Sequence, residues 1–194
     1  MDLTLGTHQE KTINAKKTMM WFGMISMFMT FAGLTSAFVV SKSRPDWLQN
    51  FNIPPMLVWS TITIVISSFT IHFAKKAIQK GNSKKGMLLL LVTLILGIAF
   101  VALQFGGFSY IISEYGYNFT GPTSNVVMSF LYVLVCLHLL HLFSGMIVLL
   151  VVIYNHSIQK YNPLNILGLE LGVMFWHFLD FLWVYLFLFF YFVR

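Results

Sequence analysis

Charged residues are scarce in this chain of 194 residues: Asp, Glu, Lys and Arg make up only 9% of it, against 58% hydrophobic residues. A soluble domain carries about 25% charged residues, so this chain has too few to cover its own surface in water. The sequence therefore predicts an integral membrane protein, and its length suits a single membrane domain over 1–194.

Cysteine is almost absent as well, because Cys136 is the only one in the chain. A lone cysteine cannot form an internal disulfide, so it gives no information on the redox compartment. Acidic residues are outnumbered six to twelve by Lys and Arg, which gives a net charge of +6. The basic residues gather at the ends of apolar runs, where anionic lipid head groups explain them, and we expect no nucleic-acid partner.

Long apolar runs are what the chain has in abundance, and five of them are long enough to cross a bilayer, which takes about 20 helical residues. None alternates as membrane strands do, so the predicted fold class is all-α, a polytopic bundle of five transmembrane helices. After a polar tail over 1–16, the predicted helices cover about 18–40, 56–74, 87–112, 126–154 and 169–193.

Lysine and arginine are unequally divided between the two ends of these helices. The polar tail and the second and fourth loops hold three, five and one of them, whereas only three lie on the opposite side. Because basic residues stay on the cytoplasmic side, the N terminus is predicted to be cytoplasmic and the C terminus external.

Three ionisable residues interrupt the last apolar run: Glu170, His177 and Asp180. An ionisable group at membrane depth costs about 2.5–3.5 kcal/mol on insertion scales, so each needs a partner. Positions seven and ten residues apart return to nearly the same side of a helix with 3.6 residues per turn. The three residues are therefore predicted to form one buried polar stripe that faces protein rather than lipid.

The fourth run carries His138 and His141, which lie three positions apart with Gly145 projecting between them. The favoured hypothesis pairs them with the stripe, because a histidine N–H donates to a carboxylate and pairing lowers the cost of burying both. The alternatives are ligation of haem or a metal together with His177, and a proton relay, for which the first and third runs supply no ionisable group.

Small residues mark the places where helices can approach one another closely. The predicted packing positions are Gly33, Gly145, Gly168 and Gly172. Aromatic side chains crowd the last run from Phe175 to Phe192, and this pattern favours packing and lipid-facing surface over a quinone pocket.

Two motifs together resemble a known family. The segment WHFLDFLWVYLF (Trp176 to Phe187), with Glu170 seven residues before His177, is similar to the last helix of subunit III of haem-copper terminal oxidases. The segment LHLLHLFSG (Leu137 to Gly145) is similar to that family's His-x-x-His-x-x-x-Gly helix. The resemblance covers the chain from about Lys17 onward and is to the five-helix bacterial form.

This resemblance implies a non-catalytic accessory subunit of a proton-pumping oxidase of aerobic respiration, in the bacterial cytoplasmic membrane. Haem and copper would lie in the partner catalytic subunit, and this chain would bind phospholipid but no redox cofactor or metal. The implied partners are subunit I as the main contact, subunit II and other small subunits. The electron donor, cytochrome c or quinol, and membership of a respiratory supercomplex stay open.

Two alternatives remain beside this reading. One is a member of the same family attached to nitric oxide reduction, and the other is a haem-binding electron-transfer protein that uses His138, His141 and His177. The chain also departs from the family pattern, because Met27 replaces an expected buried glutamate and Gly106 and Gly107 stand where an acidic residue is expected. The resemblance therefore carries over no proton-linked role at those positions.

Overall fold

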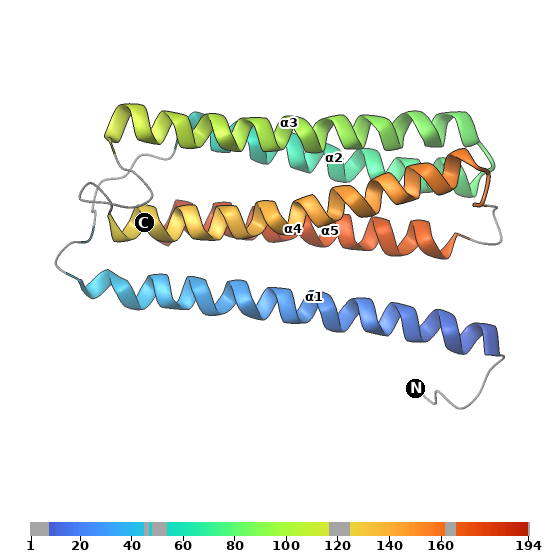
Figure 1. Cartoon of the computed structure of the whole chain (residues 1–194), viewed down its shortest axis with the longest axis horizontal. Coiled ribbons are helices and arrows are strands. Elements are labelled where there is room, and N and C mark those ends of the chain that lie inside the picture. The colour runs from blue at the N-terminus through green and yellow to red at the C-terminus, as the bar shows by residue number, and fades with distance from the viewer. Residues whose placement is uncertain (1–7, 45–46, 48–53, 117–124, 162–165, 194) are drawn as a thin grey trace.

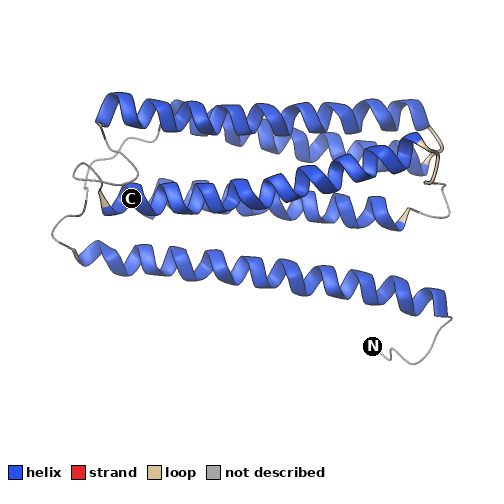
Figure 2. Cartoon of the chain, in the orientation of Figure 1, coloured by secondary structure: helices blue, strands red, loops and turns tan. Residues whose placement is uncertain are grey.

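The computed structural model describes residues 8–44, 47, 54–116, 125–161 and 166–193. These residues contain only helices and short connections, without any strand (Figure 2). The helices are α1 (His8–Val40), the short η1 (Ser41–Ser43), α2 (Pro55–Gln79), α3 (Ser83–Tyr115), α4 (Val126–Ser157) and α5 (Leu167–Val193) (Figure 1). All five α-helices are long and apolar enough to cross a membrane, which confirms the predicted all-α class with five spans.

The helices extend beyond the apolar runs that predicted them. The first begins at His8 rather than near residue 18, so the second half of the predicted polar tail is helical, and α2 continues to Gln79 rather than ending near residue 74. Hydropathy marks the part of a helix that lies in hydrocarbon, whereas helical hydrogen bonding continues into the polar region, where long lysine side chains reach water. The apolar runs therefore underestimate helix length.

Local signals in the sequence account for several helix ends. Pro55 opens α2, where its missing N–H would have had no helical partner anyway. The Asn125 side chain caps α4 by accepting a hydrogen bond of 2.9 Å from the Val127 backbone N–H. Gly116 ends α3 with a φ of 65°, a left-handed conformation that glycine adopts without a steric penalty.

The last helix occupies the centre of the bundle. In Figure 1, α1 lies alone along one side, α2 and α3 lie along the other, and α4 and α5 run between them. Helix α5 packs against α1, α2 and α4, while α3 packs against α2 and α4. Because α1 and α2 both pack on α5, the polar stripe of α5 lies between these two helices.

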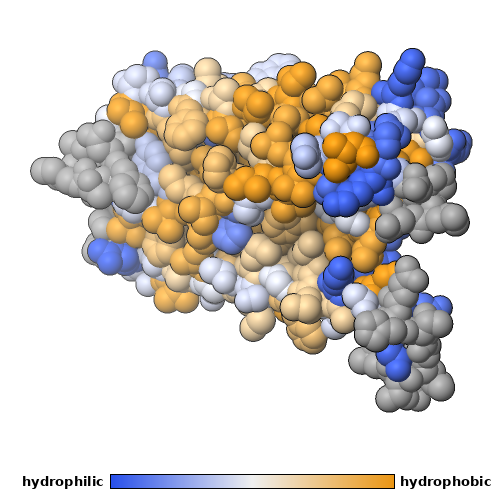
Figure 3. Space-filling view, turned by 45° about the vertical axis from the view of Figure 1, so that its right-hand side comes forward, coloured by the Kyte–Doolittle hydropathy of each residue, from blue (hydrophilic) through white to orange (hydrophobic). Residues whose placement is uncertain are grey.

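The outer surface of the bundle is apolar. Figure 3 shows hydrophobic side chains over the middle of the molecule and hydrophilic ones gathered mainly at its right-hand end. Phe22, Phe69 and Phe143 each expose more than half of their side-chain area on the outside of three different helices. Such a band suits hydrocarbon as its solvent, in agreement with the five membrane spans.

Two of the four predicted packing glycines lie where α4 and α5 come close. A Cβ atom at Gly145 would stand 2.5 Å from Cδ1 of Leu179, and one at Gly172 would stand 2.9 Å from Cγ2 of Val152. At Gly168 the nearest atom to an added Cβ is the Tyr161 hydroxyl oxygen, at 2.8 Å. Among the described residues, no atom comes within 4 Å of a Cβ added at Gly33, so this position makes no close contact with another described helix.

Candidate functional site

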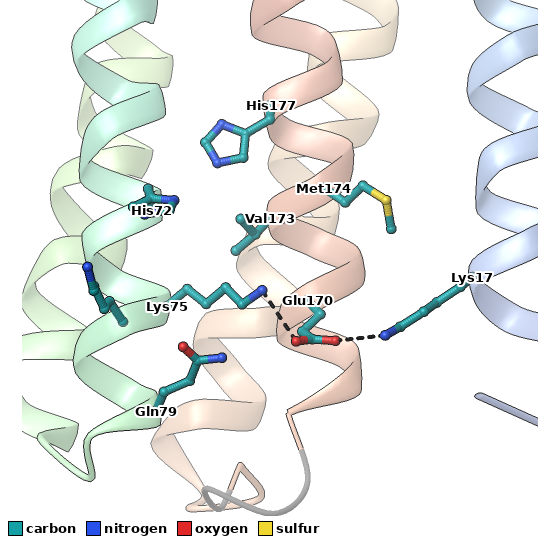
Figure 4. Close-up of a pocket in the computed structure, with 9 residues that line it drawn as sticks. Lys17, His72, Lys75, Gln79, Glu170, Val173, Met174 and His177 are labelled. Atoms are coloured by element: carbon teal, nitrogen blue, oxygen red, sulfur yellow. Dashed lines mark ion pairs between the residues drawn. The ribbon is translucent and has the colours of Figure 1, made fainter. Parts of the chain in front are cut away.

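A cleft of about 740 Å³ lies near the start of α5, where α5 meets α1 and α2 (Figure 4). It is basic, because three lysines and a single carboxylate line it. The lining residues are Lys17 from α1, His72, Lys75, Lys76 and Gln79 from α2, and Glu170, Val173, Met174 and His177 from α5.

Glu170 holds this end of the three helices together. Its Oε2 lies 3.1 Å from Nζ of Lys17, and its Oε1 lies 3.3 Å from Nζ of Lys75 (Figure 4). All three side chains are partly exposed, at 26% for Glu170, so water screens the two ion pairs. Each pair therefore contributes about 1 kcal/mol or less to stability. Two ammonium groups on one carboxylate leave the mouth of the cleft positively charged.

His177 is shared by three cavities, because it lines this cleft and two grooves beside α5. Its Nδ1 lies 2.6 Å from the Ser68 hydroxyl of α2, and either atom donates according to the state of the ring. The His72 ring, which also lines the cleft, lies 6.2 Å from the His177 ring between centroids.

The first groove, of about 430 Å³, runs between α2 and α5 and contains Asp180. Ser68, His72 and His177 form its polar lining, and the remaining lining residues are apolar: Val65, Phe69, Phe181 and Val184. Asp180 exposes only 4% of its area, and neither carboxyl oxygen has a hydrogen-bond partner among the residues that the structure describes.

The second groove, of about 470 Å³, runs between α1 and α5 and is almost wholly apolar. Its lining residues are Trp21, Met24, Ile25 and Phe28 from α1 and Met174, His177, Phe178 and Phe181 from α5. Met174 and His177 also line the basic cleft, so the apolar groove and the cleft are adjacent.

The stripe of α5 exists, but its predicted partners on α4 are wrong. His138 is fully buried, and in the described part of the chain neither of its ring nitrogens has a hydrogen-bond partner. Its ring packs instead against Trp183 and Phe100, at 5.1 and 6.0 Å between centroids. His141 uses Nδ1 on the Leu137 carbonyl of its own helix, at 2.7 Å.

The physical reason lies in the rotation of α4 and α5 about their own axes. Phe31 of α1 packs edge-on against the rings of both His138 and His141, so these histidines meet aromatic neighbours. The stripe of α5 points toward α2 and α1, which supply Ser68, Lys75 and Lys17. Of the stripe, Asp180 is fully buried, whereas Glu170 and His177 are half-buried.

The histidines do not form the ligand set that the haem or metal alternative requires. Within the described ranges, no group of three or more His, Cys, Asp and Glu side chains is arranged to hold a metal ion. His177 bonds Ser68, while His138 lies among aromatic rings.

The sequence reasoning missed α2 as the main polar partner of α5. Besides Ser68, the Ser67 hydroxyl accepts a hydrogen bond of 2.9 Å from Nε1 of Trp176, and Thr61 accepts one of 3.0 Å from Nε1 of Trp183. The signal was the hydroxyl-rich face of the second apolar run, which includes Ser60, Thr61, Ser67, Ser68 and Thr70.

Comparison with known proteins agrees with the motifs on α4 and α5. The chain matches the family model described as cytochrome c oxidase subunit III over residues 3–194. It belongs to that family. The resemblance noted in the sequence is thereby confirmed over nearly the whole chain.

Relatives of this chain are named as subunit 3 of ubiquinol, cytochrome c and quinol oxidases. The cytochrome bo(3) ubiquinol oxidase subunit 3 of Pseudomonas aeruginosa is 29% identical over 86% of this chain and 79% of that protein. The probable cytochrome c oxidase subunit 3 of Nocardia farcinica is 29% identical over 91% of this chain and 86% of that protein. The probable quinol oxidase subunit 3 of Staphylococcus aureus is 27% identical over 93% of this chain and 94% of that protein. The chain is thus a multi-pass accessory subunit of a respiratory haem-copper oxidase.

Proposed function

We propose that this chain forms a single membrane domain in the bacterial cytoplasmic membrane, packs beside catalytic subunit I of its oxidase, and holds an anionic phospholipid along α5. Haem and copper would belong to the partner subunit, and subunit II would complete the core of the complex. The observation that carries the lipid assignment is the basic cleft at the end of an apolar groove on the same helix.

The head group is assigned to the cleft by charge. Lys17, Lys75 and Lys76 line it, whereas Glu170 is the one carboxylate among its described lining residues. An ammonium group donates up to three hydrogen bonds, and lysine near a membrane surface attracts anionic lipid by about 1 kcal/mol per residue. A phosphate in the cleft would share the two lysines that now bridge to Glu170 and would reduce the excess of positive charge.

An acyl chain is assigned to the groove between α1 and α5 by its lining. Trp21, Ile25 and Phe178 offer an apolar channel at membrane depth, where a hydrocarbon chain gains dispersion contacts. Because Met174 and His177 belong to both the cleft and the groove, a single lipid can occupy both.

The orientation of the chain in the membrane is assigned from the lysines at this end of the bundle. The end of the bundle that holds the cleft also carries Lys80, Lys84 and Lys85 in and after the turn between α2 and α3. Basic residues of this density mark the cytoplasmic side, so the N terminus would be cytoplasmic and the C terminus external. Both cytochrome c and quinol occur as donors in the names of the relatives, and the donor would be set by the partner subunits.

The lipid assignment is tested with two matched triple variants of the purified complex. Lys17, Lys75 and Lys76 are changed to Gln in one variant, and Lys80, Lys84 and Lys85 are changed to Gln in the other. The cleft variant should lose bound phospholipid in native mass spectrometry, whereas the control, with the same change of charge outside the cleft, should retain it. Equal retention in both variants would contradict the lipid assignment.

The accessory role is tested by the visible spectrum. The chain expressed alone should be colourless, while the complex that it co-purifies with should carry the haem spectrum. A Soret band from the isolated chain would show that it binds haem itself and would overturn the assignment.

A further inference from the structure

The carboxyl group of Asp180, like the His138 ring, is a buried ionisable group whose polar atoms lack a hydrogen-bond partner among the described residues. It is 4% exposed, it lies in the middle of α5, and both of its oxygens lack a hydrogen-bond partner in the described residues. A buried carboxyl without a partner is costly in either protonation state, because the charged form loses its hydration and the neutral form leaves a donor and an acceptor unused. The Ser68 hydroxyl lines the same groove but also bonds His177, and a single O–H cannot satisfy both carboxyl oxygens, so a further polar partner is required.

The groove beside Asp180 has the room and the polar lining that water needs. Its volume of about 430 Å³ exceeds that of several water molecules, each of which takes about 30 Å³ in the liquid. A buried water needs two to four polar partners, and the groove offers the Asp180 carboxyl, the Ser68 hydroxyl and the rings of His72 and His177. The groove between α1 and α5, by contrast, has only His177 as a polar lining residue.

The groove is connected to the basic end of the bundle. His72 and His177 line both the groove and the cleft that holds Lys75 and Glu170. The two rings lie 6.2 Å apart between centroids, a spacing that a bridging water can span with two hydrogen bonds of about 2.8 Å each. A line of polar groups thus leads from the cleft mouth to Asp180 along the interface of α2 and α5.

In the described part of the chain, α3 and α4 contribute no side chain to the groove. Among the described residues, the ionisable groups that line the groove or the cleft come from α1, α2 and α5: Lys17, His72, Lys75, Lys76, Glu170, His177 and Asp180. The histidines of α4 face Phe31, and His138 also packs on Trp183 and Phe100.

We propose that the groove between α2 and α5 is a hydrated proton-binding site, in which water bridges the Asp180 carboxyl to Ser68 and His177 and exchanges protons with the basic cleft. In the exchange, the O–H bond of the neutral carboxyl breaks, its proton passes to the adjacent water, and a proton from the water chain restores the acid. Asp180 is then a protonatable group deep in the membrane that is open to one end of the bundle. The proposal does not depend on lipid in the other groove.

Infrared spectroscopy of the full-length chain in lipid nanodiscs tests the proposal. At neutral pH, the spectrum should contain a C=O band of a protonated carboxylic acid that is absent from the Asp180→Asn variant. On transfer to D2O this band should shift to lower frequency, because the carboxyl exchanges its proton with water. A band that stays unshifted would show a sealed site and overturn the proposal, as would the absence of such a band.

A second infrared experiment keeps the native Asp180 and labels it with an isotope. Asp2 and Asp46 are the only other aspartates in the chain, so their replacement by Asn leaves Asp180 as the sole target of ¹³C-aspartate labelling. The isotope-shifted C=O band should then appear and respond to D2O, even if Asp180→Asn fails to fold. An exchangeable band that carries no isotope shift would belong to another residue and would contradict the assignment.

The path is tested by filling the groove. Ser68→Leu places a larger apolar side chain between the cleft and the carboxyl, and it should slow the D2O shift about tenfold or more, because exchange then requires a local opening of the helix pair. Thr63→Leu is the matched control on the same helix, at a residue that bonds the Trp59 carbonyl and does not line the groove. Equal exchange rates in the two variants would overturn the route through Ser68.

Discussion

Nδ1 of His177 and the hydroxyl oxygen of Ser68 lie 2.6 Å apart and join α5 to α2. The contact places His177 against α2, the helix with the hydroxyl-rich face, rather than against α4. Glu170 reaches Lys75 of the same helix nearer the end of the bundle. The polar residues of the family motif thus connect α5 with α2.

Loss of this contact should weaken the bundle. We expect Ser68→Ala to lower the free energy of unfolding by about 0.5–1.5 kcal/mol, the usual net contribution of one hydrogen bond. Unfolding of the purified chain in mixed micelles, followed by circular dichroism, measures the change. Ser113→Ala is the control, because Ser113 is exposed and bonds the Tyr110 carbonyl of its own helix at 3.1 Å. A loss of the same size in both variants would mean that the bond to His177 contributes nothing specific.

The ion pairs of Glu170 should give the stability of the chain a dependence on salt. Wild-type stability should fall as ionic strength rises, because salt screens partly exposed charges, and Glu170→Gln should remove most of this dependence while costing about 1 kcal/mol or less at low salt. Glu114→Gln, at the opposite end of the bundle, is the control. Parallel salt curves for wild type and Glu170→Gln would contradict the ion pairs as a stabilising feature.

The fold could be read from the sequence because hydropathy reports directly on which segments lie in hydrocarbon. Five apolar runs gave five helices, and the errors lie at the ends, as at His8 and Gln79, where helical hydrogen bonds continue beyond the apolar residues. The stripe on α5 was also readable, since the spacing of Glu170, His177 and Asp180 fixes their common side whatever surrounds the helix.

The partners of the stripe could not be read in the same way. Helix α4 is apolar nearly all round, so its sequence does not show which side faces α5. His138 packs against the aromatic rings of Trp183 and Phe100 instead of pairing with the stripe. The true partner, Ser68, belongs to a residue type that often bonds the carbonyls of its own helix. Lys75 lies at the far end of an apolar run and reaches Glu170 only through its long side chain.

The buried Trp176 should depend on Ser67 as the acceptor of its indole N–H. Ser67→Ala removes the acceptor of the indole N–H at 2.9 Å and leaves that donor unpaired in the core, which costs about 1–3 kcal/mol. Trp176→Phe removes the donor as well, so a double-mutant cycle should give a favourable coupling between the two positions. Unfolding of the four proteins by denaturant measures it. Additive effects of the two substitutions would contradict the hydrogen bond.

The close approach of α4 and α5 at Gly145 should tolerate little added volume. Gly145→Ala places a Cβ 2.5 Å from Cδ1 of Leu179, so the helices must separate or the leucine must leave its position, at a cost of about 1–3 kcal/mol. Gly33→Ala is the matched control, because its Cβ would meet no described atom within 4 Å and alanine favours the helix by up to about 1 kcal/mol over glycine. The thermal midpoint should therefore fall for Gly145→Ala and hold or rise for Gly33→Ala. Combining Gly145→Ala with Leu179→Val should recover part of the loss, since the shorter side chain frees the space that the new methyl group needs. No recovery in the double variant would mean that the loss arises from something other than contact with Leu179.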